Sequence, residues 1–241
     1  MDKTILGDGG LGHAIATELR TRGEPEPRLI GRPTVGNHSR ELFRGVDIVF
    51  EASRGDAVAA NVSAALDGGV RRIVIATTGW ADDVGRVDWM LRDAGAAAVV
   101  APNLSLGAAV FLRLVDLASE LFGAIDGFEP YVLEWHRRTK LDRPSGTALE
   151  IGRRLRTQTD GRPIEVASIR AGASPGMHRV GFDAAGETIE LQLTARDRSA
   201  YAAGALAAAE WLVRMPRAPG IHPLDRVVDE LLARPALSAT A

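Results

Sequence analysis

The feature that most constrains the fold is a glycine-rich turn between a short apolar strand and an amphipathic helix at the start of the sequence. Residues 4–6 predict a strand, Gly7 to Gly12 have the spacing G-x-G-x-x-G, and residues 13–22 carry apolar side chains at helical spacing. In this context the first glycine allows a tight turn, the second lets the backbone approach a pyrophosphate, and the third lets helix pack on strand. The arrangement predicts a dinucleotide-binding fold in preference to a glycine-rich turn without a ligand.

Strands and helices alternate to about residue 103. Strands are predicted at residues 28–31, 47–51, 72–76 and 97–100, and a helix at residues 56–66. This order predicts an α/β fold with a Rossmann-like, doubly wound parallel sheet, which binds ligands at the carboxyl ends of its strands. The cofactor-binding residues that this pattern predicts are Gly7, Asp8, Gly9, Gly10, Leu11, Gly12, Thr77 and Thr78.

The end of the second predicted strand bears on the choice of cofactor. NAD-preferring folds usually carry an acidic residue there, which binds the ribose 2′-hydroxyl, whereas an arginine suits a 2′-phosphate. This chain has Gly31 followed by Arg32, with no carboxylate. We therefore expect Arg32 to contact the cofactor and NADPH to be preferred, with NADH as the alternative; the other interpretation of Arg32 is a solvated loop residue.

The pattern changes in the second half of the chain. A long apolar helix is predicted at residues 106–121, strands at 129–135, 164–169, 176–182 and 188–194, and helices after Ser145, at 200–212 and within 221–232. We expect two domains. The dinucleotide-binding domain comprises residues 1–103 and is completed by 213–241. Residues 104–212 form an α+β domain with a mostly antiparallel sheet, which we expect to bind the substrate.

A local concentration of positive charge lies at residues 134–148, which read E-W-H-R-R-T-K-L-D-R-P-S-G-T-A. The whole chain has a formal charge of −2, so these four cations are a local feature. A helix is predicted to begin directly after them, and its free N–H groups favour an anion. An extended strand would place Glu134, His136 and Arg138 on one face. The run predicts a site that binds a small carboxylate and gives it a proton; the alternative is a solvated basic loop with a satisfied histidine.

Composition excludes several classes of site and partner. The absence of cysteine rules out disulfides and thiolate metal sites, and the five histidines show no H-E-x-x-H spacing, so we expect no metal. Near-neutral charge argues against nucleic-acid binding, and no apolar run reaches the length of a membrane span. No signal peptide is evident, so we expect a cytoplasmic protein.

Several separated motifs occur together in one order: A-P-N-L-S-L-G at residues 101–107, the run at 134–148, Arg170 to Gly172 with His178, and Arg198 with the small residues that follow it. In these motifs the chain resembles the 4-hydroxy-tetrahydrodipicolinate reductase (dihydrodipicolinate reductase) family of bacterial lysine and diaminopimelate synthesis. The resemblance implies a two-domain reductase that uses NADPH or NADH and is usually a homotetramer assembled through its C-terminal sheets.

The resemblance also implies roles for individual residues. His136 would be the general acid that protonates the substrate after hydride arrives, and Lys140 the second catalytic group. The substrate, a cyclic dicarboxylate, would be bound by Arg137, Arg138, Gly146, Thr147 and Arg198. Further cofactor contacts would come from Ser53, Ala76, Ala101, Pro102, Asn103 and Leu104. We expect neighbouring cations to lower the pKa of His136 in the empty site and a bound dianion to raise it.

The chain departs from the family pattern at three places. Arg137 stands where the family usually has a second histidine, Leu193 stands where it usually has another, and the glycine loop is one residue shorter. These differences leave open the same chemistry on another cyclic imine acid. A separate alternative is a non-catalytic NADPH-binding sensor, against which the presence of His136 and Lys140 argues.

Overall fold

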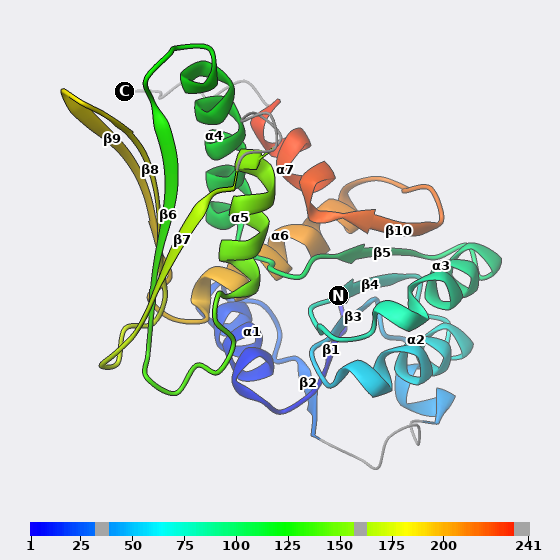
Figure 1. Ribbon diagram of the computed structural model, residues 1–241. Helices are drawn as coiled ribbons and strands as arrows, with labels where there is room; N and C mark the ends of the chain where they lie inside the picture. Colours follow the sequence, from blue (N-terminus) through cyan, green and yellow to red (C-terminus); the bar gives the residue numbers. More distant parts are fainter. Residues whose placement is uncertain (32–38, 157–162, 234–241) are drawn as a thin grey trace, which may run out of the picture. The chain divides into compact units, whose positions relative to one another are not determined.

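The computed structural model describes residues 1–31, 39–156 and 163–233 (Figure 1). The chain packs as two units, of which the first contains Met1–Leu106 and the chain from Arg198 onward, and the second contains Gly107–Asp197. Their architectures confirm the predicted fold class: a Rossmann-like parallel sheet with helices, and a second α+β unit with its own sheet.

The first unit is a six-stranded parallel sheet in the order β10-β5-β4-β3-β1-β2. Its strands are β1 (Lys3–Leu6), β2 (Arg28–Ile30), β3 (Ile48–Glu51), β4 (Arg72–Ile75), β5 (Ala97–Val100) and β10 (Gly220–Pro223). Its helices are α1 (Gly10–Thr21), α2 (Val58–Asp67), α3 (Val84–Asp93), α6 (Ser199–Arg214) and α7 (Leu224–Leu232), with single 3-10 turns at Arg40–Phe43, Gly55–Ala57 and Ala81–Asp83. The strands are apolar on both faces because helices cover both: α2 and α3 pack with Ile73 and Ile75, and α1 and α6 pack together.

Three details of this unit differ from the sequence expectation. The helix predicted within 221–232, with Pro223 at its start, is present as α7 from Leu224, but the residues before it form the unpredicted strand β10, which pairs in parallel with β5. Helix α3 was not predicted. Helix α6 packs in the first unit and not in the second, so the boundary falls before Arg198 and not after residue 212. Gly204 permits this packing, since a Cβ there would lie 1.7 Å from the Leu104 carbonyl oxygen.

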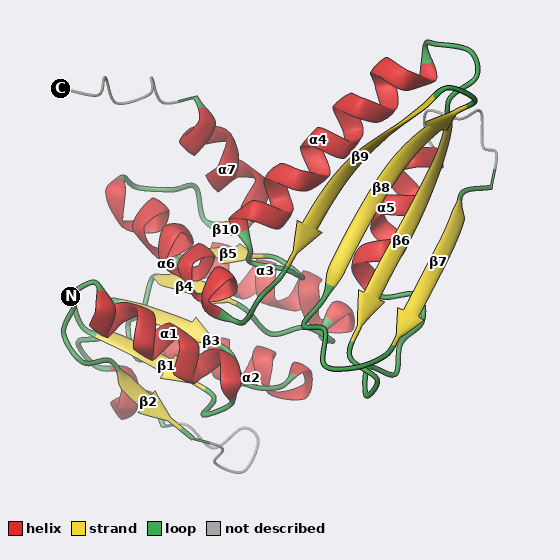
Figure 2. Cartoon of the chain, turned by 90° about the vertical axis from the view of Figure 1, so that its left-hand side faces the viewer, coloured by secondary structure: helices red, strands yellow, loops and turns green. Residues whose placement is uncertain are grey.

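The second unit is a four-stranded sheet in the order β7-β6-β8-β9, with two helices on one face (Figure 2). The strands are β6 (Glu129–His136), β7 (Glu165–Arg170), β8 (Met177–Ala184) and β9 (Glu187–Thr194), and the helices are α4 (Leu106–Gly123) and α5 (Gly146–Arg156). The sheet is mostly antiparallel, as predicted, but β6 and β7 are parallel because α5 forms the crossover between them. Phe111, Ile151 and Val180 belong to the core between helices and sheet.

Among the described helices, none is both long enough and apolar enough to cross a membrane.

Candidate active site

The glycine loop between β1 and α1 has the geometry of a pyrophosphate cradle. Gly7 has a φ of +109°, and a Cβ there would lie 2.3 Å from the Ala52 carbonyl oxygen, so only glycine fits. A Cβ on Gly12 would lie 2.0 Å from the carbonyl oxygen of Gly7. A Cβ on Gly9, in contrast, would meet nothing within 4 Å, and α1 has no side-chain cap at its N-terminus. The open N–H groups of this helix start therefore fit the phosphates of a dinucleotide.

The other residues predicted to contact the cofactor follow the carboxyl ends of adjacent parallel strands. Ser53 follows β3, Ala76 to Thr78 follow β4, and Ala101 to Leu104 follow β5, so these loops lie along one edge of the sheet. Arg32 lies outside the described residues. The expectation that Arg32 favours NADPH therefore stays a prediction.

Sequence reasoning missed Glu51, a buried carboxyl at the end of β3 that ties two of these loops together. Its Oε1 accepts hydrogen bonds from the Ser53 N–H (3.0 Å) and the Thr77 hydroxyl (3.1 Å), and its Oε2 accepts one from the Asn61 amide (2.9 Å). Burial raises the pKa of Glu51 against the effect of these donors. The available signal was a charged residue that ends an otherwise apolar strand.

Arg198 lies in the first unit, against the glycine loop. A Cβ on Gly10 would come within 2.5 Å of its guanidinium Nη1. The cation thus stands beside the N-terminus of α1, next to the expected position of the phosphates. Its predicted contact with substrate stays a prediction.

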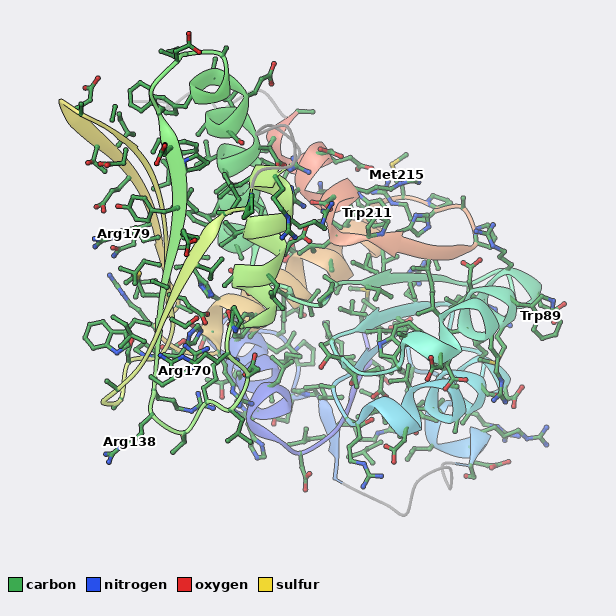
Figure 3. The ribbon with its side chains drawn as sticks, in the orientation of Figure 1. Trp89, Arg138, Arg170, Arg179, Trp211 and Met215 are labelled. Carbon is green, nitrogen blue, oxygen red and sulfur yellow. The ribbon has the colours of Figure 1, made fainter. Side chains whose placement is uncertain are left out.

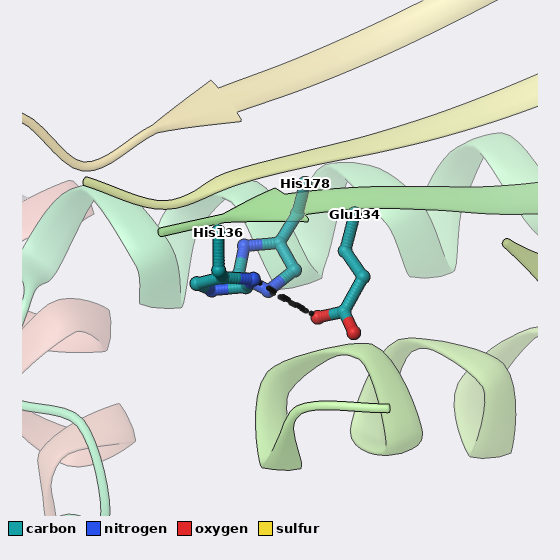
Figure 4. Close-up of side chains that lie close together, drawn as sticks. All are labelled: Glu134, His136 and His178. Atoms are coloured by element: carbon teal, nitrogen blue, oxygen red, sulfur yellow. Dashed lines mark ion pairs between the residues drawn. The ribbon is translucent and has the colours of Figure 1, made fainter. Parts of the chain in front are cut away.

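In the second unit, Glu134 and His136 on β6 and His178 on β8 bring three buried titratable side chains together (Figure 4). Oε2 of Glu134 lies 3.3 Å from Nδ1 of His136 and 3.7 Å from Nε2 of His178. The two imidazole rings meet edge to face, with centroids 5.0 Å apart. Antiparallel pairing of β6 with β8 sets Glu134 directly opposite His178, which is why residues far apart in sequence meet here.

Glu134 is held by donors on its other oxygen. Oε1 accepts hydrogen bonds from the Ser145 N–H (3.0 Å), the Ser168 hydroxyl (2.7 Å) and the Arg170 guanidinium (2.7 Å). Burial alone would raise the pKa of Glu134, but these donors outweigh burial and lower the pKa to about 2. Glu134 is therefore ionised, and its second oxygen faces the two histidines.

The surroundings of both histidines favour the neutral imidazole, because burial lowers both pKa values. Burial lowers the pKa of His136, opposed by the Glu134 carboxylate and reinforced by the charges of Lys140 and Arg170. Burial lowers the pKa of His178 further, to about 4, and the neighbouring His136 adds to the effect. The lowered pKa of His136 agrees with the expected influence of local cations on the empty site, although burial is the larger cause.

The three side chains also have the composition of a metal site. Their donor atoms lie within 4.8 Å of one another. However, the Arg170 guanidinium already neutralises the Glu134 carboxylate at 2.7 Å, and a cation bound there would meet a second positive charge at close range. We interpret the cluster as a proton-handling network and not as a metal centre.

The start of α5 adjoins this network through Ser145. The Ser145 hydroxyl accepts the Ala148 N–H (3.2 Å), as an N-cap does, and lies 3.0 Å from Nε2 of His178. The N–H groups of Gly146 and Thr147 have no hydrogen-bond partner among the described residues. They are thus available to an anion, and their predicted contact with substrate stays a prediction.

The predicted cations are dispersed. Lys140 pairs with Asp142 at 2.7 Å, and the Arg137 guanidinium donates to the Thr139 hydroxyl at 3.2 Å. Strand β6 ends at His136, so the expected alternation does not extend to Arg138, whose exposed side chain points away from the ribbon in Figure 3. Arg170, from the end of β7, is the cation that enters the network.

The comparisons with known proteins agree with this geometry. The family model "Dihydrodipicolinate reductase, C-terminus" matches residues 107–228, which is half of the chain. A 4-hydroxy-tetrahydrodipicolinate reductase from Thiobacillus denitrificans is 32% identical over 215 residues, covering 81% of this chain and 78% of that protein. The chain belongs to the dihydrodipicolinate reductase family. The resemblance inferred from the separated sequence motifs is thereby confirmed.

Two further comparisons support family and fold. A 4-hydroxy-tetrahydrodipicolinate reductase from Campylobacter fetus is 34% identical over 210 residues, covering 78% of this chain and 80% of that protein. Among solved structures, the dipicolinate-bound dihydrodipicolinate reductase from Paenisporosarcina sp. TG-14 aligns with a TM-score of 0.73. That alignment has 17% identity and covers 92% of this chain and 97% of the other, so it supports the fold alone.

Proposed function

We propose that this protein is an NAD(P)H-dependent reductase that converts 4-hydroxy-tetrahydrodipicolinate to tetrahydrodipicolinate in lysine and diaminopimelate biosynthesis. Family membership supports the substrate. The observation that carries the chemistry is the buried Glu134 carboxylate beside Nδ1 of His136, next to a helix start with free N–H groups. It combines a proton donor with an anion site, as a reductase of a cyclic dicarboxylate requires.

The first unit would hold the cofactor. The loop from Gly7 to Gly12 fits the pyrophosphate, and the loops after β3, β4 and β5 complete the edge along which a dinucleotide would lie. When bound, the reduced nicotinamide supplies the hydride. NADPH and NADH are both chemically competent, and the prediction of NADPH rests on Arg32 in the sequence alone.

The second unit would bind the substrate and supply the proton. The N–H groups of Gly146 and Thr147 would hold one carboxylate, and cations of the preceding loop the other. Nδ1 of His136 faces the Glu134 carboxylate at 3.3 Å, so the proton would leave from Nε2. A Cβ on Gly176 would lie 3.3 Å from this nitrogen, so the glycine keeps space beside it. Lys140 would act with His136 as the second catalytic group.

The state of His136 fits a donor that is charged only in the complex. Burial and neighbouring cations lower its pKa without substrate. A bound dianion would add negative charge near the ring and raise this pKa, which loads the proton when it is needed.

A second candidate substrate is another cyclic imine acid, supported by Arg137 and Leu193. Leu193 pairs in register with His178 and packs against the core, so an apolar residue stands beside the histidine pair where the family usually has a third imidazole. A third candidate, a non-catalytic NADPH sensor, would not require the buried Glu134–His136 pair, because a sensor transfers no proton.

The test is turnover of a matched substrate panel. We expect loss of reduced-nicotinamide absorbance with 4-hydroxy-tetrahydrodipicolinate, and rescue of a lysine-requiring strain that lacks the reductase. Turnover only with cyclic imines that carry one carboxylate would favour the second candidate. Tight dinucleotide binding with no turnover of any imine would favour the sensor.

We also propose a cytoplasmic homotetramer assembled through the sheet of the second unit. Within that unit no described helix covers the second face of the sheet, where Trp135 and Ile169 are each 41% exposed. Light scattering on the purified protein tests this: a tetramer mass supports it, and a monomer at micromolar concentration contradicts it.

A further inference from the structure

The carboxyl end of β2 lacks the side chain that usually binds adenosine ribose. In dinucleotide folds an acidic residue at this point takes the ribose 2′-hydroxyl. Here the strand ends at Ile30 and is followed by Gly31. The Gly7 N–H donates to the Ile30 carbonyl oxygen at 2.9 Å, which fixes the glycine loop beside the end of β2.

The side chain of Asp8, inside the glycine loop, fills the space beside Gly31. A Cβ on Gly31 would lie 2.7 Å from Oδ2 of Asp8 and 3.2 Å from its carboxylate carbon. The carboxylate of Asp8 therefore lies where any side chain at position 31 would begin. It is exposed and has no hydrogen-bond partner among the described residues.

Charge around the loop is divided in the way a dinucleotide requires. No acidic residue lies in the first turn of α1, whose N–H groups face the expected pyrophosphate. The Arg198 guanidinium lies beside Gly10 on that same helix start. The negative charge of Asp8 lies instead against Gly31, at the end of β2, where the ribose is expected.

We propose that Asp8 supplies from the glycine loop the carboxylate that β2 lacks, and that it binds the adenosine ribose hydroxyls and selects NADH over NADPH. This inference rests on the proposed function only in requiring that the first unit bind a nicotinamide dinucleotide. A carboxylate accepts hydrogen bonds from the two ribose hydroxyls, whereas a 2′-phosphate brings close to two negative charges toward it. The preference is opposite to the one that Arg32 suggested from sequence.

The test compares the dissociation constants of NADH and NADPH. Both are measured by titration calorimetry for the full-length wild type and three variants. The wild type is expected to bind NADH at least about tenfold more tightly than NADPH, which corresponds to about 1.4 kcal/mol. Asp8→Asn removes the charge at nearly constant shape and should bring the two constants within about threefold, chiefly by tightening NADPH. Gly31→Ala keeps the charge but displaces the carboxylate, and should reduce the preference in the same direction.

Asp67→Asn is the matched control. Asp67 is the exposed last residue of α2, so it lies at the opposite edge of the sheet from the strand carboxyl ends. Its variant should keep the wild-type ratio. Tighter NADPH binding by the wild type, or an unchanged ratio in Asp8→Asn, overturns the role of Asp8 and leaves the reductase proposal standing. Failure of the wild type to bind either dinucleotide overturns both.

Discussion

Replacing Glu134 by glutamine removes one negative charge and almost no volume from the centre of the proton-handling network. The carboxylate oxygen lies 3.3 Å from Nδ1 of His136. At an effective dielectric constant of about 20, this separation corresponds to roughly 5 kcal/mol of attraction toward an imidazolium. The Arg170 guanidinium on the other oxygen offsets part of that attraction. A close opposite charge typically shifts a pKa by about one to three, which corresponds to about 1.4 to 4 kcal/mol.

The expected consequence is a fall in kcat of about 10- to 1000-fold near neutral pH. The sign follows from the role of His136 as an acid: turnover needs the imidazolium, so activity is lost as pH rises through the pKa of His136 in the complex. Without the carboxylate that pKa is lower. The alkaline limb of the kcat profile should therefore move to lower pH, with part of the activity recovered in acid.

The assay is the pH dependence of kcat, with Ser168→Ala as the matched control. Ser168 donates to the same carboxyl group, so its loss removes one hydrogen bond, worth about 1 kcal/mol of stability, without changing charge. The control should keep the wild-type profile. A loss of activity in Glu134→Gln by the same factor at every pH would refute the reasoning, because a purely structural defect does not move a titration.

Three further predictions concern the cap, the glycine loop and pH-dependent stability. Ser145→Ala removes the N-cap of α5 and should cost about 1 kcal/mol in urea unfolding; KM should rise more than kcat falls, because the cap orders the helix start whose N–H groups would bind a substrate carboxylate. Gly12→Ala places a Cβ 2.0 Å from the carbonyl oxygen of Gly7. We expect the free energy of unfolding to fall by about 1–3 kcal/mol, the melting temperature to fall with it, and added dinucleotide to give no stabilisation. The third prediction follows from the pKa of His178, which burial lowers from 6.5 to about 4. Between these pH values the unfolded chain binds more protons, so about 3 kcal/mol of stability present above pH 6.5 is lost as pH falls through about 4. The free energy of unfolding in urea should fall less steeply across this pH range in His178→Gln than in the wild type. An equal fall in both proteins would contradict this role of His178.

Local sequence patterns predicted the strands β1 to β5 and the glycines Gly7 and Gly12 that begin and end the glycine loop. Parallel strands buried on both faces are continuous apolar runs, and the spacing of Gly7 and Gly12 is fixed by contacts within a few residues. Strand β10 escaped prediction because four residues ending in Pro223 become a strand only through pairing with β5. The unit to which α6 belongs likewise depends on distant packing, at Gly204.

The same division applies to the site. The helix start at Gly146 and the place of His136 at a strand end could be predicted, because a capping serine and a strand end are local signals. The role of Glu134 could not, since its partners Ser168, Arg170 and His178 arrive from β7 and β8. Strand register decides which of these side chains meet, and register is set by the whole sheet.

The most direct test of the account separates chemistry from binding at His136. We would measure kcat with 4-hydroxy-tetrahydrodipicolinate and the dissociation constant of dipicolinate, a stable cyclic dicarboxylate, for wild type and His136→Gln. The account predicts a loss of kcat of about 100-fold or more, with dipicolinate affinity changed less than about fivefold. Unchanged turnover in His136→Gln would contradict the assignment of His136 as the proton donor.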